Sequence, residues 1–274
     1  MKASPAPQPD STSGGVAEEQ EAFKRLLLLS RAYTQTGENY LAHGPKWNPS
    51  RWKPLIEKHL PGLIGWKPES GERVTRELVR NLWLEAKSPD DAVNAFFLTM
   101  VWGYGSSFRG PGNILAMLNS HEHENLGQLL LARREESTGM PSTAYYKLLA
   151  SKISELGPVY ASKFMYFITP DDCRVPVLDM WVTRWAQEYG LNFELKSSVK
   201  WQLNVEQLTN FTSFCQRTLN ALNQLEDDKS IHPGIVDAGY IEYLIFFDAK
   251  FNAVRNDFPT WILLTPKEKR KIFD

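Results

Sequence analysis

One stretch of the chain, residues 154–185, constrains the fold more strongly than any other; it reads SELGPVYASKFMYFITPDDCRVPVLDMWVTRW. Pro158 suits the first position of a helix, because the N–H group that proline lacks would have no partner there. A helix is expected over residues 159–168, where apolar side chains recur at helical spacing until a Thr-Pro-Asp-Asp sequence. Asp179 precedes a second helical pattern, residues 180–189, as an N-cap. The stretch predicts two helices joined by a loop, with a carboxylate at the start of the second.

Two short motifs in this stretch resemble the helix-hairpin-helix DNA glycosylases. The sequence LGPVYA at residues 156–161 is similar to the second half of that superfamily's hairpin, usually written L-P-G-V-G-x-x-x-A. The sequence VPVLDMWVTR at residues 175–184 resembles the segment that contains the catalytic aspartate, as in the adenine glycosylases of the superfamily. Nearer still, GPVYASKF at residues 157–164, together with the Leu-Asp pair of the second motif, is similar to a bacterial group of 8-oxoguanine-glycosylase-like proteins. Some members of that group act in antiphage defence.

The resemblance implies an all-α, two-lobed helix-hairpin-helix fold with the active site in the cleft between the lobes. It implies an enzyme that flips a modified base out of double-stranded DNA and cleaves its N-glycosidic bond, leaving an abasic site. The base is left open between an 8-oxoguanine-like lesion and a hypermodified phage base such as glucosylated hydroxymethylcytosine. The alternative is a non-catalytic helix-hairpin-helix module that only binds DNA.

The hairpin departs from the family pattern at Glu155, which stands where the first glycine is expected and places a carboxylate beside the phosphate-binding turn. Gly157 is expected to supply a positive φ angle or a close approach to a ligand. With the amides of Val159 and Tyr160 it is a candidate phosphate contact at a helix N-terminus, or else an ordinary turn glycine. Arg109 is a further candidate for DNA contact. Because the chain has a net charge of −1, we expect a local basic patch to bind DNA.

Asp179 is the first candidate catalytic residue. Cleavage of an N-glycosidic bond builds oxocarbenium-like positive charge on the sugar, and a nearby carboxylate stabilises that charge and activates a nucleophile. Hydrogen bonds from backbone N–H groups at a helix start favour a charged carboxylate. The alternative is that Asp179 is only a helix cap.

Lys163 is the second candidate catalytic residue. The resemblance aligns Val159 with the Schiff-base lysine of the bifunctional 8-oxoguanine glycosylases, so the usual lysine position is empty here. Lys163 lies one turn later on the same helix face, and a desolvated amine beside Asp179 is a competent nucleophile. AP-lyase activity, in which a lysine forms an imine with the sugar, is therefore an alternative to simple hydrolysis. In a structural alternative, Lys163 reaches the surface or pairs with Asp179 or Asp172.

Aromatic residues in two other segments are candidates for the pocket that holds the flipped base. The first segment is a Gly-rich loop after a buried helix expected over residues 91–102; the second is an aromatic helix expected over residues 237–251. For each of these aromatic residues taken alone, packing in the protein core is the alternative explanation. Core packing is also the commoner role of an aromatic helix. The candidate pocket residues are Trp102, Tyr104, Phe108, Tyr240, Glu242 and Phe246.

The rest of the chain shows helical patterns, almost no alternating β pattern and no repeat of fixed period. Residues 1–19, rich in Pro, Ser, Gly and Ala, predict a disordered tail. Residues 20–274 predict one helical domain, in which residues 150–186 form the hairpin and the catalytic segment. The predicted fold class is therefore all-α.

The two cysteines, Cys173 and Cys215, are too few for the four-cysteine iron–sulfur cluster of some helix-hairpin-helix glycosylases. His121 and His123 do not share a helix face, so a metal site is not expected either. No apolar run approaches the roughly 20 residues of a membrane span, and the N-terminus lacks the pattern of a signal peptide. We therefore expect a cytoplasmic monomer without cofactor or membrane association, whose partner is double-stranded DNA containing a modified base.

Overall fold

The computed structural model describes residues 12–60, 71–191, 205–225 and 237–252, which form eleven α-helices. Within these ranges there is no β-strand, only an isolated bridge between Lys46 and Arg73, so the all-α prediction is confirmed. The helices are α1 (Thr12–Thr34), α2 (Pro49–His59), α3 (Arg76–Glu85), α4 (Pro89–Tyr104), α5 (Gly110–Leu118), α6 (His123–Ser137), α7 (Pro141–Ala150), α8 (Pro158–Ile168), α9 (Met180–Glu188), α10 (Val205–Gln224) and α11 (Ala238–Asn252).

Side-chain caps explain why several helices begin where they do. The Ser88 hydroxyl accepts from the Asp91 N–H group and the Asp91 carboxylate accepts from the Ser88 N–H group, which makes a capping box at the start of α4. Thr75 caps α3 by accepting from the Leu78 N–H group. Asp179 caps α9, as predicted. Each cap provides a partner for N–H groups that the first turn of a helix leaves unsatisfied.

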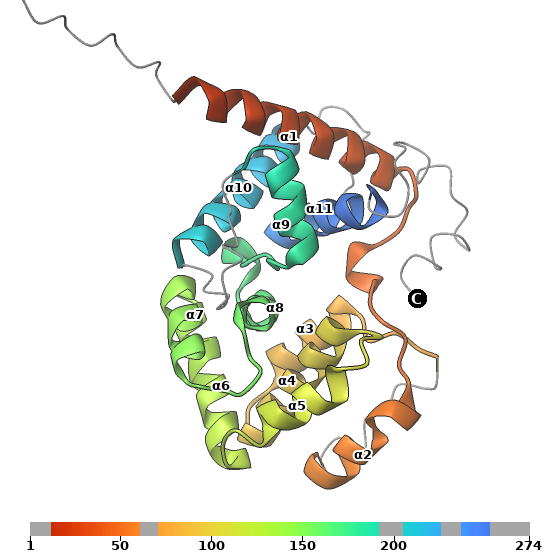
Figure 1. Ribbon diagram of the computed structural model, residues 1–274, viewed down its shortest axis with the longest axis vertical. Coiled ribbons are helices and arrows are strands. Elements are labelled where there is room, and N and C mark those ends of the chain that lie inside the picture. The colour runs from red at the N-terminus through yellow and green to blue at the C-terminus, as the bar shows by residue number, and fades with distance from the viewer. Residues whose placement is uncertain (1–11, 61–70, 192–204, 226–236, 253–274) are drawn as a thin grey trace, which may run out of the picture.

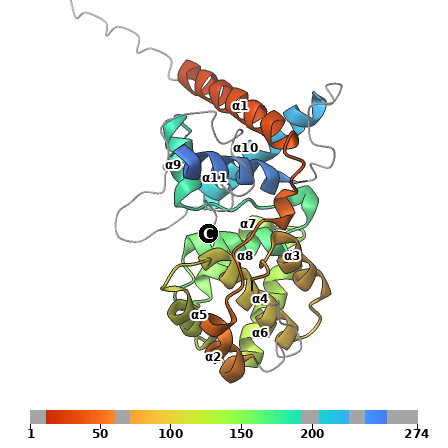
Figure 2. The ribbon, with the colours of Figure 1, turned by 90° about the vertical axis from the view of Figure 1, so that its right-hand side faces the viewer.

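Helix α8 occupies the middle of the molecule, with α2 to α6 on one side and α1, α9, α10 and α11 on the other (Figure 1). The perpendicular view in Figure 2 shows the same two groups of helices. Helix α8 packs against α3, α4, α6 and α7, while α11 packs against α1, α9 and α10. Eight of the eleven residues of α8 are buried, so only its first turn is open to a large partner.

Aromatic packing holds α8 against α3 and α4. Phe164 of α8 makes edge-on contacts with Trp83 and Phe96, at ring-centre distances of 5.2 and 5.9 Å. The Trp83 indole N–H donates to the Thr99 hydroxyl at 2.9 Å, which satisfies its polar atom inside the core. Because Lys163 precedes Phe164, this packing also sets the direction of the lysine.

The start of one helix differs from the sequence-based expectation. Helix α1 begins at Thr12, inside the segment expected to be a disordered tail, and residues 1–11 lie outside the described part of the chain. Glu19 of α1 accepts a hydrogen bond from Arg217 of the remote helix α10 at 2.5 Å, a contact that local composition does not reveal. Helix α7 ends at Ala150, and Lys152 then adopts a φ angle of +58°.

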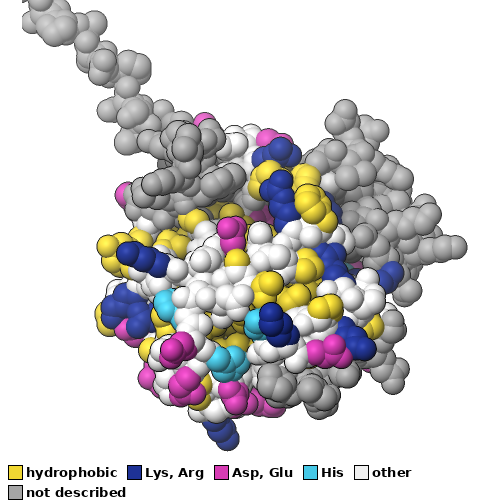
Figure 3. Space-filling view, turned by 60° about the horizontal axis from the view of Figure 1, so that its bottom comes forward, with side chains coloured by type: hydrophobic (Ala, Val, Ile, Leu, Met, Phe, Trp, Pro, Cys, Tyr) yellow, Lys and Arg dark blue, Asp and Glu magenta, His cyan; other side chains and the backbone are white. Residues whose placement is uncertain are grey.

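None of the helices in the described ranges is long and apolar enough to cross a membrane. The molecular face in Figure 3 carries acidic and basic side chains interspersed, in keeping with the net charge of −1. Overall charge therefore does not mark this face as a binding surface for an anionic polymer.

Candidate active site

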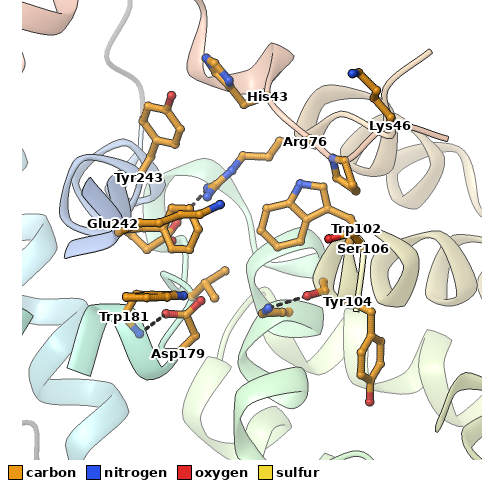
Figure 4. Close-up of a pocket in the computed structure, with 18 of the residues that line it drawn as sticks. His43, Lys46, Arg76, Trp102, Tyr104, Ser106, Asp179, Trp181, Glu242 and Tyr243 are labelled. Atoms are coloured by element: carbon orange, nitrogen blue, oxygen red, sulfur yellow. Dashed lines mark hydrogen bonds and ion pairs between the residues drawn. The ribbon is translucent and has the colours of Figure 1, made fainter. Parts of the chain in front are cut away.

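A cavity of about 470 Å³ lies beside α8, and its lining residues range from His43 to Lys250 in the sequence. Small-molecule sites typically have volumes of about 300–1,000 Å³, so this cavity can enclose a small organic group. The lining comes from the segment before α2 and the first turn of α2, from α3, from the end of α4, from α8, from the start of α9 and from α11 (Figure 4). Asp179 and Lys163, the two candidate catalytic residues, both line it.

Asp179 is held at the cavity wall by its own helix. Its Oδ1 atom accepts hydrogen bonds from the N–H groups of Trp181 at 2.9 Å and Val182 at 3.2 Å. The preceding residue, Leu178, is fully buried, and its N–H group donates to the Ser162 hydroxyl of α8 at 3.2 Å. The Asp179 side chain is 9 % exposed, and no hydrogen bond to Oδ2 is present among the described residues. One carboxylate oxygen is therefore fixed, and the other is available to a ligand.

Lys163 projects from α8 toward the end of α4. Its Nζ atom donates to the Gly103 carbonyl oxygen at 2.9 Å and lies 5.8 Å from the centre of the Trp102 ring and 5.3 Å from that of Tyr160. A Cβ atom at Gly103 would lie 2.9 Å from the lysine Cδ, so glycine makes room for this side chain. Burial lowers the pKa of Lys163, and the Asp179 carboxylate opposes that shift. The lysine is 8 % exposed, and among the described residues it forms no ion pair with Asp179 or Asp172.

A buried ion pair forms another part of the wall. Arg76 of α3 donates from Nη1 to the Glu242 Oε2 atom of α11 at 2.8 Å, and both side chains line the cavity (Figure 4). The Arg76 guanidinium lies 4.9 Å from the ring centres of both Trp102 and Tyr166. Burial raises the pKa of Glu242 to about 7, and Arg76 opposes the shift.

Sequence reasoning missed Arg76, because a charged residue in the first turn of a helix is ordinarily solvated. Only Glu242 carried a signal, since it is the one acidic residue within a run of apolar and aromatic residues, AGYIEYLIFF.

Four of the six candidate pocket residues line the cavity: Trp102, Tyr104, Glu242 and Phe246. Trp102 and Trp181 reach toward the cavity from the α4 side and the α9 side (Figure 4). Tyr104 stacks on Tyr160 with ring centres 4.0 Å apart. Trp181, Tyr243 and Lys250 also line the cavity but were not among the predicted site residues.

The other two candidates, Phe108 and Tyr240, are not among the residues that line this cavity. Tyr240 lies on the face of α11 that packs toward α1, where its hydroxyl is 3.1 Å from the Ser30 hydroxyl and its ring meets Tyr33. Phe108 follows the last turn of α4 and is 85 % exposed. Arg109 lies at the N-cap position of α5, with its guanidinium 5.5 Å from the Phe108 ring centre. This pair therefore lies on the surface rather than in the cavity.

The turn before α8 also differs from expectation. Gly157 has an extended backbone with a φ angle of −74°, whereas Glu155 has a φ angle of +60°. Glu155 stands where the family hairpin is expected to have its first glycine. Its backbone is left-handed there, a conformation that glycine adopts more readily than other residues. Gly157 caps α8 without any side-chain hydrogen bond, and a Cβ there would meet nothing within 4 Å. The N–H groups of Val159 and Tyr160 thus begin a helix whose N-terminus is open.

Positive charge concentrates at the cavity. Five Lys and Arg residues line it against two carboxylates, although the chain as a whole has a net charge of −1. One of the five, Lys250, lies at the end of α11 with its Nζ atom 5.7 Å from the Phe246 ring centre. Burial lowers the pKa of Lys250, and the Asp179 carboxylate opposes that shift.

The histidines that were weighed as metal ligands have separate partners. His121 Nε2 is 3.1 Å from the Ser151 carbonyl oxygen, and His123 Nε2 is 2.9 Å from the Asp90 carboxylate. In the described ranges no group of three or more His, Cys, Asp and Glu side chains is arranged to hold a metal ion.

The fold and the site define an all-α protein with a helix-capping aspartate in a cavity of aromatic and cationic side chains. The model of one family, described as "Putative 8-oxoguanine DNA glycosylase OGG-like protein", matches residues 38–246. The chain belongs to this family, and the match includes Lys163, Asp179 and Glu242. Comparison with curated proteins and with solved structures gave no match.

Proposed function

We propose that the protein is a DNA glycosylase that flips a modified base out of double-stranded DNA and hydrolyses its N-glycosidic bond. The observation that most supports this activity is the Asp179 carboxylate, which two backbone N–H groups of α9 hold at the wall of an aromatic cavity. Membership of the 8-oxoguanine DNA glycosylase-like family supports the same activity.

In this proposal Asp179 acts on the sugar. As the glycosidic bond breaks, positive charge develops at C1′ and the ring oxygen, and a fixed carboxylate stabilises that charge without reorganising. The start of α9 holds Oδ1, so Oδ2 faces the sugar and orients the attacking water. The helix N-terminus also favours a negative charge at this position.

The aromatic side chains bind the base. Trp102 and Trp181 offer flat apolar surfaces from opposite sides of the cavity, and flipped bases are commonly held by stacking of this kind (Figure 4). The proposed substrate is an 8-oxoguanine-like lesion or a hypermodified phage base such as glucosylated hydroxymethylcytosine. The first corresponds to a role in DNA repair and the second to a role in antiphage defence.

The DNA backbone is proposed to contact the open start of α8 and the exposed Lys46 beside the cavity. The two groups of helices on either side of α8 then act as the two lobes that close on the DNA. Arg51, which also lines the cavity, is occupied by the carbonyl oxygens of Ser106 and Ser107, so it supports the loop rather than the DNA. The affinity should fall as salt is raised, because each phosphate that a cation neutralises steepens the salt dependence by about one unit.

Lys163 is proposed to be needed for base excision, with or without a covalent intermediate. Its lowered pKa increases the fraction of neutral amine that can attack C1′. Borohydride reduction tests this: an imine would link wild-type protein to abasic DNA, and Lys163→Ala would not be linked. If the Lys163→Ala variant releases base at the wild-type rate, Lys163 is a structural residue.

The decisive experiment for the proposed function is mass spectrometry of bases released from a panel of duplexes, each with one modified base. Wild-type protein should release one class of base, and Asp179→Asn should release none while keeping its DNA affinity. Asp90→Asn is the matched control, since Asp90 is an exposed aspartate in the first turn of α4 and should not affect release. DNA binding without release of any base by the wild-type protein would instead support the non-catalytic module.

A further inference from the structure

Two carboxyl groups face the cavity in different surroundings. Asp179 is held by two backbone N–H groups at a helix start, whereas Glu242 is 1 % exposed and accepts a hydrogen bond from Arg76 at Oε2. Among the described residues nothing else donates to the Glu242 carboxyl, so Oε1 is available to a molecule in the cavity (Figure 4). Two carboxyl groups whose environments differ in this way commonly serve as the acid and the anion of one active site.

We propose that Glu242 is the general acid that protonates the departing base, while Asp179 remains the anion beside the sugar. The inference rests on the glycosylase activity proposed above and assigns the second half of the reaction to a named residue. Its geometric support is that the two groups line one cavity from neighbouring elements, with Asp179 just before α9 and Glu242 on α11, and α9 packs against α11. A base that lies between Trp102 and Trp181 then has the sugar on the Asp179 side and its ring nitrogens near Glu242.

The electrostatic surroundings of Glu242 suit this role. Burial raises its pKa to about 7; Arg76 opposes that shift, Asp179 adds to it and Lys163 opposes it. A sizeable fraction of Glu242 is therefore protonated near neutral pH, as a general acid requires. The titratable groups around it are Arg76 of α3, Lys163 of α8, Asp179 before α9, Cys215 of α10, and Tyr243 and Lys250 of α11, with Tyr33 of α1 facing Tyr243.

The step balances without any further reactant. The electron pair of the C1′–N bond moves to the base, and the Glu242 proton moves to a ring nitrogen, so the base leaves neutral and Glu242 becomes a carboxylate. The positive charge at C1′ is stabilised by Asp179 until water adds there and the water proton returns to Glu242. Arg76 is a positioning residue, because it holds Oε2 and directs Oε1 into the cavity.

The test is single-turnover base release from the duplex identified by the panel, measured as the pH is raised through about 7. The wild-type rate should fall as Glu242 loses its proton. Glu242→Gln should be slower by about 10²- to 10⁴-fold at low pH and should lose this decline. The rate loss of Glu242→Gln should be smaller on a second duplex, whose modified base leaves readily as an anion. The rate loss of Asp179→Asn should be the same on the two duplexes.

The matched control is Asp248→Asn. Asp248 is also buried, also on α11 and also paired with an arginine, Arg25, but it does not line the cavity. A rate loss of equal size in this control, or a wild-type pH profile in Glu242→Gln, would overturn the inference. If Glu242→Gln does not fold, a wild-type rate that is flat or rises across this pH range overturns it as well. Absence of base release by the wild-type protein at every pH would instead defeat the proposed function itself.

Discussion

The cavity has two walls that are built in different ways. The local wall comes from one continuous segment, and its lining residues are Lys163, Val177, Asp179 and Trp181. The remote wall comes from α3, α4 and α11, and its main residues are Arg76, Trp102, Glu242 and Lys250. In the local wall, the backbone of α9 holds the carboxylate. In the remote wall, the Glu242 carboxylate is held by the side chain of Arg76, which lies 166 residues away in the sequence. A change in the remote wall should therefore harm folding more than a change in the local wall.

The largest expected effect is that of Arg76→Met in the remote wall. Removal of one partner of a buried ion pair leaves the other charge unpaired and typically costs about 3–5 kcal/mol of unfolding free energy. Without Arg76 the pKa of Glu242 should rise further above about 7, so the loss should be greatest above that pH and smaller below it. Denaturant unfolding at several pH values measures the effect.

The double variant Arg76→Met, Glu242→Gln is the control for this prediction. It removes both charges, so it should lose less stability than Arg76→Met alone. A double variant that is as unstable as the single variant would mean that the pair acts by packing rather than by charge.

The next effect concerns Asp179 in the local wall. Asp179→Ala removes the cap of α9 and should lower the unfolding free energy by about 1 kcal/mol, whereas Asp179→Ser keeps a cap and should lose much less. Both should abolish base release, because neither has a carboxylate. Ser88→Ala, which removes the cap of α4 away from the cavity, should lose similar stability and keep its activity. Base release by Asp179→Ser would contradict the catalytic role.

A smaller effect is expected at the turn that leads into the local wall. Glu155→Gly relieves a left-handed backbone and should raise the unfolding free energy by about 0.5–1 kcal/mol. It should also tighten DNA binding, since a carboxylate beside the proposed phosphate contact is lost. Lys152→Gly relieves the same strain but removes a cation, so it should gain stability and lose DNA affinity. If Glu155→Gly and Lys152→Gly change the DNA affinity by the same amount, the DNA does not bind near this turn.

The smallest effect is expected for Lys163→Met, compared with the wild type over a range of pH. Because burial lowers the pKa of Lys163 below its usual 10.5, the charged lysine disfavours the folded state, and this penalty disappears as pH rises toward 10.5. The wild type should therefore gain stability relative to Lys163→Met as the solution is made alkaline. Thermal unfolding at several pH values measures the difference. A difference that is constant with pH would mean that Lys163 is neutral or solvated in the folded protein.

The local wall was predictable because its signals lie next to one another in the chain. Pro158 marks the start of one helix and Asp179 caps the next, and both are local effects of backbone geometry that composition and order reveal. Lys163 was recognisable as a charged residue in an apolar helix. The family match supports the resemblance that these motifs indicated.

The sequence by itself determined the all-α class, the helices α8 and α9 and the cap at Asp179. Only the tertiary structure decided that Arg76 meets Glu242, that Tyr240 faces α1 instead of the cavity, and that Phe108 is left on the surface. The physical reason is that a helical pattern identifies an apolar face but not its neighbour, because side-chain contacts between distant helices depend on how all the helices pack. Helix starts depend on hydrogen bonds within a few residues, whereas the remote wall depends on contacts that span most of the chain.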